Sequence, residues 1–139
     1  MNTNLGTWKK WKPEVDIFPN FCIKAIDNTT EGLFINLKNE IDNDNIVIMI
    51  NVIWFSYRVI KIENCSKTIE RLKEIEGPDF FDSWSLFEVE DSNYLKWFEK
   101  ESLGIYEGVK HYVFMGYNLV FEVLMYEPGS LKIIKEDVS

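Results

Sequence analysis

The sequence is poor in the residue types on which most recognisable active sites depend. Its 139 residues include one histidine and two cysteines, with Gly 7 and Pro 4. A site built from several histidines is therefore excluded. The chain also has no Gly-rich phosphate loop, no G-x-S-x-G turn and no C-x-x-C pair, so the common motifs for nucleotide, acyl-transfer and zinc chemistry are missing. No catalytic residue, metal site or cofactor is predicted.

Long apolar segments are also missing. Residues 1–12 carry lysines and tryptophans, unlike the apolar core of a signal peptide. The longest apolar stretch, residues 46–55, is far shorter than the roughly 20 residues of a membrane-spanning helix, and Asn51 interrupts it. We therefore expect a cytoplasmic protein that makes no membrane contact, in which Cys22 and Cys65 are thiols.

Acidic residues outnumber basic ones, and the whole excess lies in the second half of the chain. The net charge is -8. Residues 1–62 carry seven basic and seven acidic groups, whereas residues 63–139 carry eight basic and sixteen acidic groups. Such a balance disfavours binding to nucleic acid or to an anionic membrane through charge neutralisation. A protein partner with a basic surface fits the charge better, and direct contact with nucleic acid is not expected.

Apolar residues are abundant enough for a folded domain. The chain is 46% hydrophobic, 15% aromatic and 27% charged, a composition that excludes disordered and low-complexity proteins. Its length suits one hydrophobic core but hardly two. Residues 1–139 are therefore predicted to form one domain, with 1–12 and 132–139 as frayed ends.

Several segments are typical of strands because they are rich in β-branched and aromatic residues. The longest, residues 46–62, is apolar on both alternating faces up to about residue 55, which predicts a central strand covered on both sides. Its length predicts a break near Asn51 or Ser56. A polar turn is expected between residues 37 and 46. Further strands are expected at 21–26, 33–37 and 84–90, and in a hairpin over 111–126.

Two segments have the pattern of helices. Ile69, Leu72 and Ile75 recur every three residues before Gly77, which predicts a helix over 66–76. A second helix is expected over 92–101, capped by Asp91 or Ser92. The resulting order β-β-β-α-β-α-β-β lacks βαβ alternation, so the fold class predicted is α+β: a largely antiparallel sheet of about five to six strands, with two helices packed on it.

Acidic and aromatic residues alternate in one region of the second half. Between residues 74 and 91 there are seven carboxylates and no Lys or Arg. Clustered carboxylates steer a basic partner, and aromatic rings anchor an interface. Alternatively, the acids form a solvated rim and the rings face the core. The residues predicted to bind a partner are Glu76, Asp79, Phe80, Phe81, Asp82, Trp84, Glu88, Glu90 and Asp91.

Three isolated polar residues are further candidates. His111 is expected to be a structural residue that makes one hydrogen bond, although a Cys–His dyad with Cys22 or Cys65 stays open. Glu122 lies in an otherwise apolar strand, so it is expected to pair with Arg58 or with a lysine, unless it is functional.

The chemistry leaves a rival function open. A small-ligand-binding protein or enzyme would have a pocket between the sheet and the helices, lined by Glu122, His111 or Tyr112. An exposed strand edge would also allow a homodimer to form by strand pairing.

Four strings of residues in the chain are distinctive: Tyr57-Arg58, Trp84 to Phe98, His111-Tyr112-Val113, and Val120 to Leu124 before Pro128. With these strings the chain resembles small bacterial immunity proteins, which are found beside polymorphic or contact-dependent toxins. The resemblance covers roughly residues 46–128. It implies a cytoplasmic, cofactor-free protein that binds one toxin domain and blocks its active site or substrate surface. On this basis the chain is predicted to be a non-catalytic immunity protein that neutralises its toxin through the acidic, aromatic-rich region.

Overall fold

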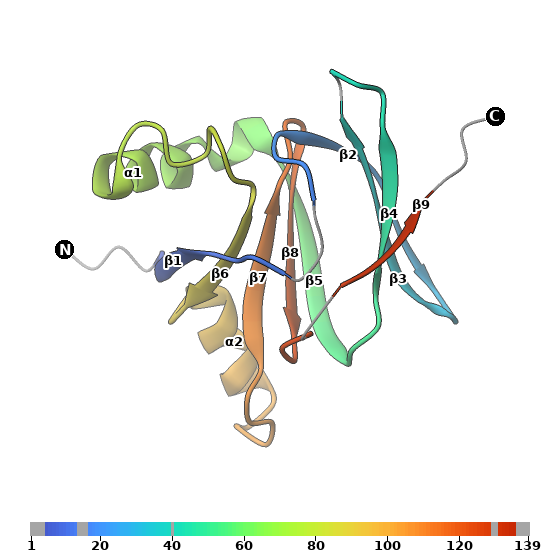
Figure 1. Cartoon of the computed structure of the whole chain (residues 1–139). Coiled ribbons are helices and arrows are strands. Elements are labelled where there is room, and N and C mark those ends of the chain that lie inside the picture. Colours follow the sequence, from blue (N-terminus) through green and yellow to red (C-terminus); the bar gives the residue numbers. More distant parts are fainter. Residues whose placement is uncertain (1–4, 14–16, 40, 129–130, 136–139) are drawn as a thin grey trace.

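The predicted α+β class with antiparallel strands is confirmed, but the strands form two sheets. A computed structural model describes residues 5–13, 17–39, 41–128 and 131–135. In these residues a five-stranded sheet and a four-stranded sheet are accompanied by two α-helices (Figure 1). The strand count of about five to six was therefore too low, because the short strands at residues 7–10 and 132–135 were missed and the segment 46–62 forms two strands instead of one.

The five-stranded sheet is antiparallel and has the order β1-β6-β7-β8-β5. Its centre is the hairpin of β7 and β8, which confirms the hairpin expected over 111–126. The edge strands β1 and β5 come from distant parts of the chain. The bounds are β1 Thr7–Lys10, β5 Trp54–Lys61, β6 Leu86–Glu90, β7 Lys110–Met115 and β8 Leu119–Met125.

The four-stranded sheet has the order β2-β3-β4-β9. The polar turn expected between residues 37 and 46 joins β3 to β4, and the chain breaks after β4 at residues 51–53 before it enters the other sheet. The break expected near Asn51 is thus confirmed. The bounds are β2 Phe21–Thr29, β3 Gly32–Asn39, β4 Asn45–Ile50 and β9 Lys132–Lys135.

Both predicted helices are present. Helix α1 spans Ser66–Glu76 and follows a 3₁₀ turn at Ile62–Cys65. Helix α2 spans Asn93–Glu101. Its first turn is capped by Ser92, whose Oγ accepts a hydrogen bond from the backbone N–H of Leu95 at 3.1 Å. This cap satisfies one of the donors that a helix N-terminus leaves without a partner.

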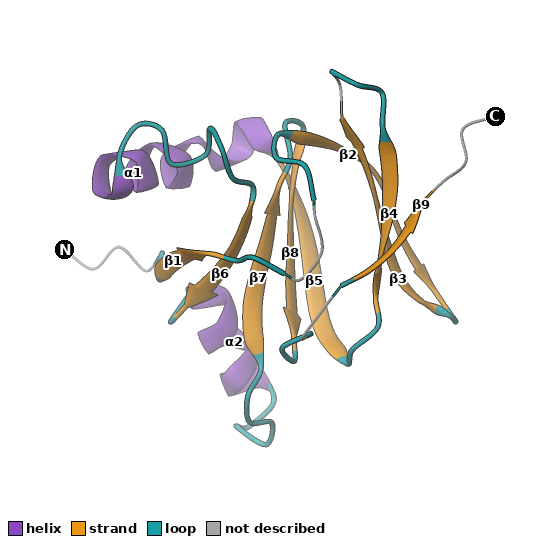
Figure 2. Ribbon diagram, viewed as in Figure 1, coloured by secondary structure: helices purple, strands orange, loops and turns teal. Residues whose placement is uncertain are grey.

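The molecule has three layers (Figure 2). One hydrophobic core lies between the two sheets and contains inward side chains of both, such as Ile35 of β3 and Phe121 of β8. A second, smaller core lies on the outer face of the five-stranded sheet, where Leu72 of α1 packs with Phe87 and Val113. The five-stranded sheet is therefore covered on both faces at its centre.

Two expectations about individual strands were wrong. The strands covered on both sides are β7 and β8, whereas the predicted central segment 46–62 is divided between half-covered β4 and the edge strand β5. The expected frayed ends are also partly ordered, because residues 7–10 form β1 and residues 132–135 form β9. Pairing with β6 and β4 stabilises these short strands. The remainder of the expected ends, residues 1–4 and 136–139, lies outside the described residues.

Candidate functional site

The aromatic residues of the predicted acidic region turn toward the core. Phe87 is fully buried, and the rings of Phe80 and Phe81 pack against it with centroid distances of 5.0 and 5.5 Å. The ring of Trp8 from β1 completes this cluster. Trp84 is half-buried, and its indole Nε1–H donates a hydrogen bond to the carbonyl of Trp11 at 2.9 Å. This arrangement matches the alternative in which the rings face inward.

The carboxylates of the same region lie outside the core but differ in their surroundings. Glu88 is half-buried, with an ion pair to Lys110 at 3.6 Å, and Glu90 pairs with Lys9 at 2.7 Å. The hydrogen bond and charge of Glu90 raise the pKa of Lys9. The other four predicted acids, all exposed and in no ion pair within the described residues, are Glu76, Asp79, Asp82 and Asp91.

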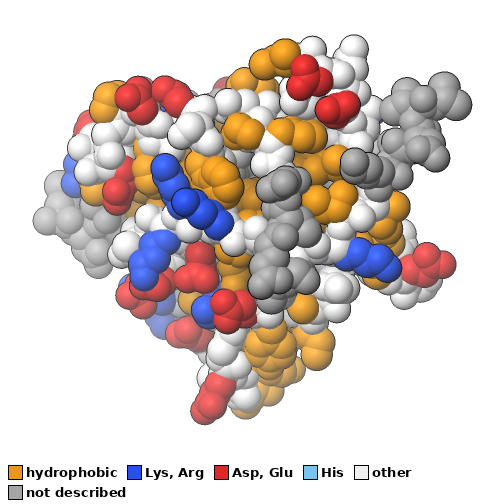
Figure 3. Space-filling view, in the orientation of Figure 1, with side chains coloured by type: hydrophobic (Ala, Val, Ile, Leu, Met, Phe, Trp, Pro, Cys, Tyr) orange, Lys and Arg blue, Asp and Glu red, His pale blue; other side chains and the backbone are white. Residues whose placement is uncertain are grey.

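Large apolar side chains are exposed in a different place, at the C-terminal end of α2. Trp97 is 51% exposed, and Leu103, Ile105 and Tyr106 in the following loop are 86%, 69% and 43% exposed. Figure 3 shows hydrophobic side chains gathered at the lower end of the molecule, where this loop projects in Figure 1. We call this patch the α2 surface and define it as Phe55, Trp97, Phe98, Leu103, Ile105 and Tyr106.

The α2 surface is organised by an aromatic cluster. The ring centroids of Phe98 and Tyr106 lie 5.3 and 4.7 Å from that of Phe55, which occupies an irregularity in the pairing of β5 with β8. Leu103 has a φ of 57°, in the left-handed region that a leucine seldom adopts. A strained backbone that carries a nearly fully exposed leucine is the kind of feature found at functional sites.

A chain of polar side chains crosses the outer face of the five-stranded sheet below α2. The Oγ of Ser92 lies 2.7 Å from Nδ1 of His111, and Nε2 of His111 lies 2.8 Å from Oε1 of Glu122. Arg58 Nε donates to Oε2 of the same carboxylate at 2.6 Å, and Nη2 donates to Oε1 at 3.2 Å. The antiparallel pairing of β5 with β8 brings Arg58 and Glu122 together, because the two residues stand directly opposite each other.

One assignment of protons satisfies every group in this chain. With Glu122 ionised, His111 donates from Nε2 and accepts at Nδ1 a hydrogen bond from the Ser92 hydroxyl. The Ser92 oxygen still accepts from Leu95 as the helix cap. Ser92 is only 4% exposed. Although serine, histidine and glutamate are the components of some hydrolytic triads, the geometry here makes Ser92 the link between the helix and the sheet.

Glu122 is ionised although it is 5% exposed. Burial alone would raise the pKa of this carboxyl, but the hydrogen bonds from His111 and Arg58 outweigh burial, and the net pKa is lowered. The expected pairing of Glu122 with Arg58 is confirmed. His111 makes two side-chain hydrogen bonds instead of the single one expected.

Arg58 is itself held in place by an aromatic ring. Its guanidinium carbon lies 4.1 Å from the ring centroid of Tyr94, the buried residue of α2. The Tyr94 hydroxyl lies 2.5 Å from Oγ of Ser56 on β5. Burial is the main reason why the pKa of Tyr94 is raised. The stacking on Tyr94 and the two hydrogen bonds to Glu122 together fix the orientation of the Arg58 guanidinium, although the side chain is 46% exposed.

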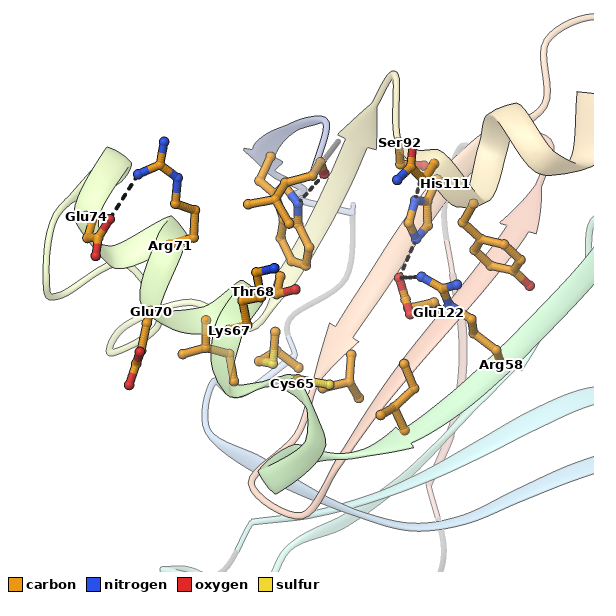
Figure 4. Close-up of a pocket in the computed structure, with 18 residues that line it drawn as sticks. Arg58, Cys65, Lys67, Thr68, Glu70, Arg71, Glu74, Ser92, His111 and Glu122 are labelled. Carbon is orange, nitrogen blue, oxygen red and sulfur yellow. Dashed lines mark hydrogen bonds and ion pairs between the residues drawn. The ribbon is translucent and has the colours of Figure 1, made fainter. Parts of the chain in front are cut away.

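This chain forms one end of a cavity of about 1020 Å³ on the outer face of the sheet, between α1 and the N-terminus of α2. Figure 4 shows Ser92, His111, Glu122 and Arg58 on one side, with the residues of α1 facing them across the opening. A pocket between sheet and helices was expected only under the rival function. The structure brings Glu122 and His111 to it, whereas Tyr112 packs in the core on the other face of the sheet.

The Cys–His dyad left open by the sequence is not formed. Cys65 also lines the cavity, but its thiol donates to the carbonyl of Lys61 at 3.8 Å. Both ring nitrogens of His111 are already engaged by Ser92 and Glu122. Burial, followed by the charge of Glu122, raises the pKa of Cys65, so the thiol stays protonated at neutral pH.

Sequence reasoning missed the α2 surface, although a signal was present. The predicted helix ends near residue 101, and the next residues include Leu103, Ile105 and Tyr106. Apolar residues in a short loop after a helix have no element of their own in which to be buried, so they mark an exposed patch or a contact with a neighbouring element.

The described residues contain neither a cluster of metal ligands nor a membrane-spanning helix. Within the described ranges, no group of three or more His, Cys, Asp or Glu side chains could hold a metal ion. No helix in that part of the chain has the length and apolar character needed to cross a membrane. Comparisons with protein-family models, curated proteins and solved structures find no match to this chain. Its function must therefore be inferred from its own residues.

Proposed function

We propose that this chain is a non-catalytic binding protein that neutralises a bacterial protein toxin, and that the α2 surface holds the toxin domain. The observation that carries the proposal is the exposure of Trp97 on α2 and of Leu103, Ile105 and Tyr106 in the loop that follows this helix. Exposed apolar patches rimmed by polar residues mark interaction sites, and aromatic side chains supply most of the anchoring energy in protein interfaces.

The charge of the whole chain favours a basic partner, whereas the rim of the α2 surface is mixed, with Lys96 and Lys100 exposed beside its carboxylates. Glu99, Glu101 and Glu107 are exposed near the patch, and none of them is in an ion pair within the residues that the structure describes. The whole chain carries a net charge of -8. Carboxylates at the rim of an apolar patch would steer a basic toxin surface toward the anchors and would add orientation once it docks.

The acidic region from Glu76 to Asp91 has a second role in this proposal. Its exposed carboxylates, such as Asp79 and Asp82, contribute to the long-range field, whereas its rings stabilise the outer core. The loop that carries these acids and the loop after α2 lie toward opposite ends of the five-stranded sheet (Figure 1). We therefore assign steering to the first region and anchoring to the second.

Co-expression with the protein encoded by the adjoining reading frame tests the proposal. That protein alone should arrest the growth of a bacterial host, and this chain should restore growth. Trp97→Ala combined with Tyr106→Ala should abolish the rescue, because both anchors are lost. Tyr117→Ala is the matched control, since Tyr117 is 56% exposed in the β7–β8 turn and lies outside the patch. A non-toxic neighbour, or full rescue by the double variant, would contradict the proposal.

Association kinetics separate steering from anchoring. Charge reversal of the exposed Asp79 and Asp82 should slow association at low salt and leave dissociation nearly unchanged, because exposed charges act on encounter. The α2 double variant should instead accelerate dissociation. Unchanged kinetics after the charge reversals would remove the acidic region from the interaction.

A further inference from the structure

The cavity between α1 and α2 shares no residue with the α2 surface, so it is a separate candidate site. Its volume of about 1020 Å³ is at the upper end of the range of small-molecule pockets, about 300–1,000 Å³. It lies on the outer face of the five-stranded sheet, between α1 and the start of α2 (Figure 4).

The two ends of the cavity differ in chemistry. The polar end is the chain formed by Ser92, His111, Glu122 and Arg58. The remaining sheet wall is apolar. Its side chains come from β1, β5, β7 and β8, and they are Trp8, Ile60, Met115 and Val120. A ligand that fills this space must therefore combine an apolar body with a polar head.

Among the described residues, only one member of the polar end has hydrogen-bond donors to spare. Ser92 and His111 use their donors and acceptors within the chain, and both oxygens of Glu122 accept. Arg58 uses Nε–H and a single Nη2–H, which leaves the donors of Nη1 and the second donor of Nη2 without a partner in the described residues. The polar end thus offers donors to a ligand and has no accessible acceptor that needs a proton.

The charges that line the cavity allow an anionic head at this end. Glu122 is neutralised by Arg58, and Glu74 on α1 pairs with Arg71 at 3.0 Å. This pairing leaves Lys67 and Glu70 of α1 as the unpaired charges of the lining. The N-terminus of α2, with its partial positive charge, begins beside Ser92 at the same end of the cavity.

We infer that the cavity binds an amphipathic anion, with an oxyanion head on the outer edge of the Arg58 guanidinium and an apolar body along Trp8, Met115 and Val120. The planar fork of arginine suits a carboxylate or phosphate oxygen pair. Arg58 is already oriented by Glu122 and by the Tyr94 ring, so binding requires little further ordering of this side chain.

Titration calorimetry with three probes of equal chain length tests the inference: decanoate, decyl phosphate and decanol, each below its aggregation limit. The carboxylate, the phosphate or both should bind at least about tenfold more tightly than the alcohol, as expected for charge-assisted hydrogen bonds. The NMR signal of the Trp8 indole N–H, which donates to the Leu5 carbonyl at 3.0 Å, should shift only if the body enters the cavity. Equal affinity for all three probes, or binding of none, would overturn the inference.

Variants of Arg58 locate the head. Arg58→Met combined with Glu122→Gln removes the guanidinium without leaving a buried carboxylate unpaired, and it should cost about tenfold in affinity for the anions and nothing for decanol. Arg58→Lys keeps the charge but loses the planar fork, so it serves as the second variant if the first is poorly folded by circular dichroism. Lys61→Met is the control, because Lys61 is an exposed cation on the same strand outside the cavity. Unchanged anion binding in the folded Arg58 variants would contradict the assignment.

Discussion

The two helices lie on the same face of the five-stranded sheet but are attached to it in different ways. Helix α1 has no side-chain cap and rests on apolar contacts, with Leu72 buried in the outer core. Helix α2 is linked through Ser92 to His111 and Glu122, and Tyr94 is its buried residue. A helix that is held by polar bonds can leave its remaining apolar side chains exposed. This difference explains why the rings near α1 are core and the rings near α2 are available to a partner.

The strongest test of this comparison replaces one aromatic residue near each helix with alanine. Phe87→Ala should cost about 3–5 kcal/mol of unfolding free energy, because Phe87 is fully buried beneath Trp8, Phe80 and Phe81. Trp97→Ala should change it by less than about 1 kcal/mol, since half of the side chain is already exposed. Urea denaturation of both variants measures the difference. Equal losses would show that the α2 rings are structural as well.

A smaller effect is expected when the polar attachment of α2 is broken. Arg58→Met leaves Glu122 buried with His111 as its remaining partner and should cost about 3 kcal/mol. Hydrogen exchange should rise in α2 and stay slow in α1, because only α2 depends on this chain of bonds. Uniform loss of protection in both helices would contradict separate attachment.

Acid should loosen the same attachment. The pKa of Glu122 is lowered in the folded protein, so this group stabilises the fold above its unfolded pKa of about 4.3, and the contribution disappears as the pH falls through the lower folded value. Protection of α2 should therefore decline below about pH 4, whereas Glu122→Gln should lack this part of the pH dependence. The same decline in the Gln variant would assign the transition to other carboxylates.

The smallest effect has the opposite sign. Leu103→Gly should raise stability by about 1 kcal/mol, because glycine accepts the φ of 57° without strain. The same change should weaken toxin binding, since it removes an anchor that is 86% exposed. Thermal unfolding and rescue of growth measure the two effects. A loss of stability would show that Leu103 packs within the protein.

Most local elements were predictable because their signals are local. The apolar spacing and Gly77 identify α1, and Ser92 identifies the start of α2. Strands β1 and β9 were missed because each has four residues and is stabilised by pairing with a strand far away in the sequence. Sequence alone therefore described the helices better than the sheets.

The candidate sites were predictable only in part, for the same reason. The pair of Arg58 and Glu122 could be anticipated from an acid within an apolar strand. The link to His111 could not, because it depends on the diagonal register of β7 against β8, in which Glu122 stands opposite Val113. The alternation of acidic and aromatic residues along β6 was consistent with rings that face the core and also with rings that face a partner. Phe87 faces the outer core because Trp8 of β1, the rings of Phe80 and Phe81, and helix α1 cover that face of β6, and all of these are distant from β6 or unpredictable in position from the sequence pattern.

The central claim is that the α2 surface anchors a toxin, and side-chain footprinting of the complex tests it most directly. Hydroxyl-radical labelling should be compared for this chain alone and bound to the protein of the adjoining reading frame. Labelling of Trp97 and Tyr106 should fall strongly on binding, and labelling of Tyr117 should stay constant, because only the first two lie in the patch. An intact complex in which Trp97 and Tyr106 are labelled as in the unbound chain would contradict the account.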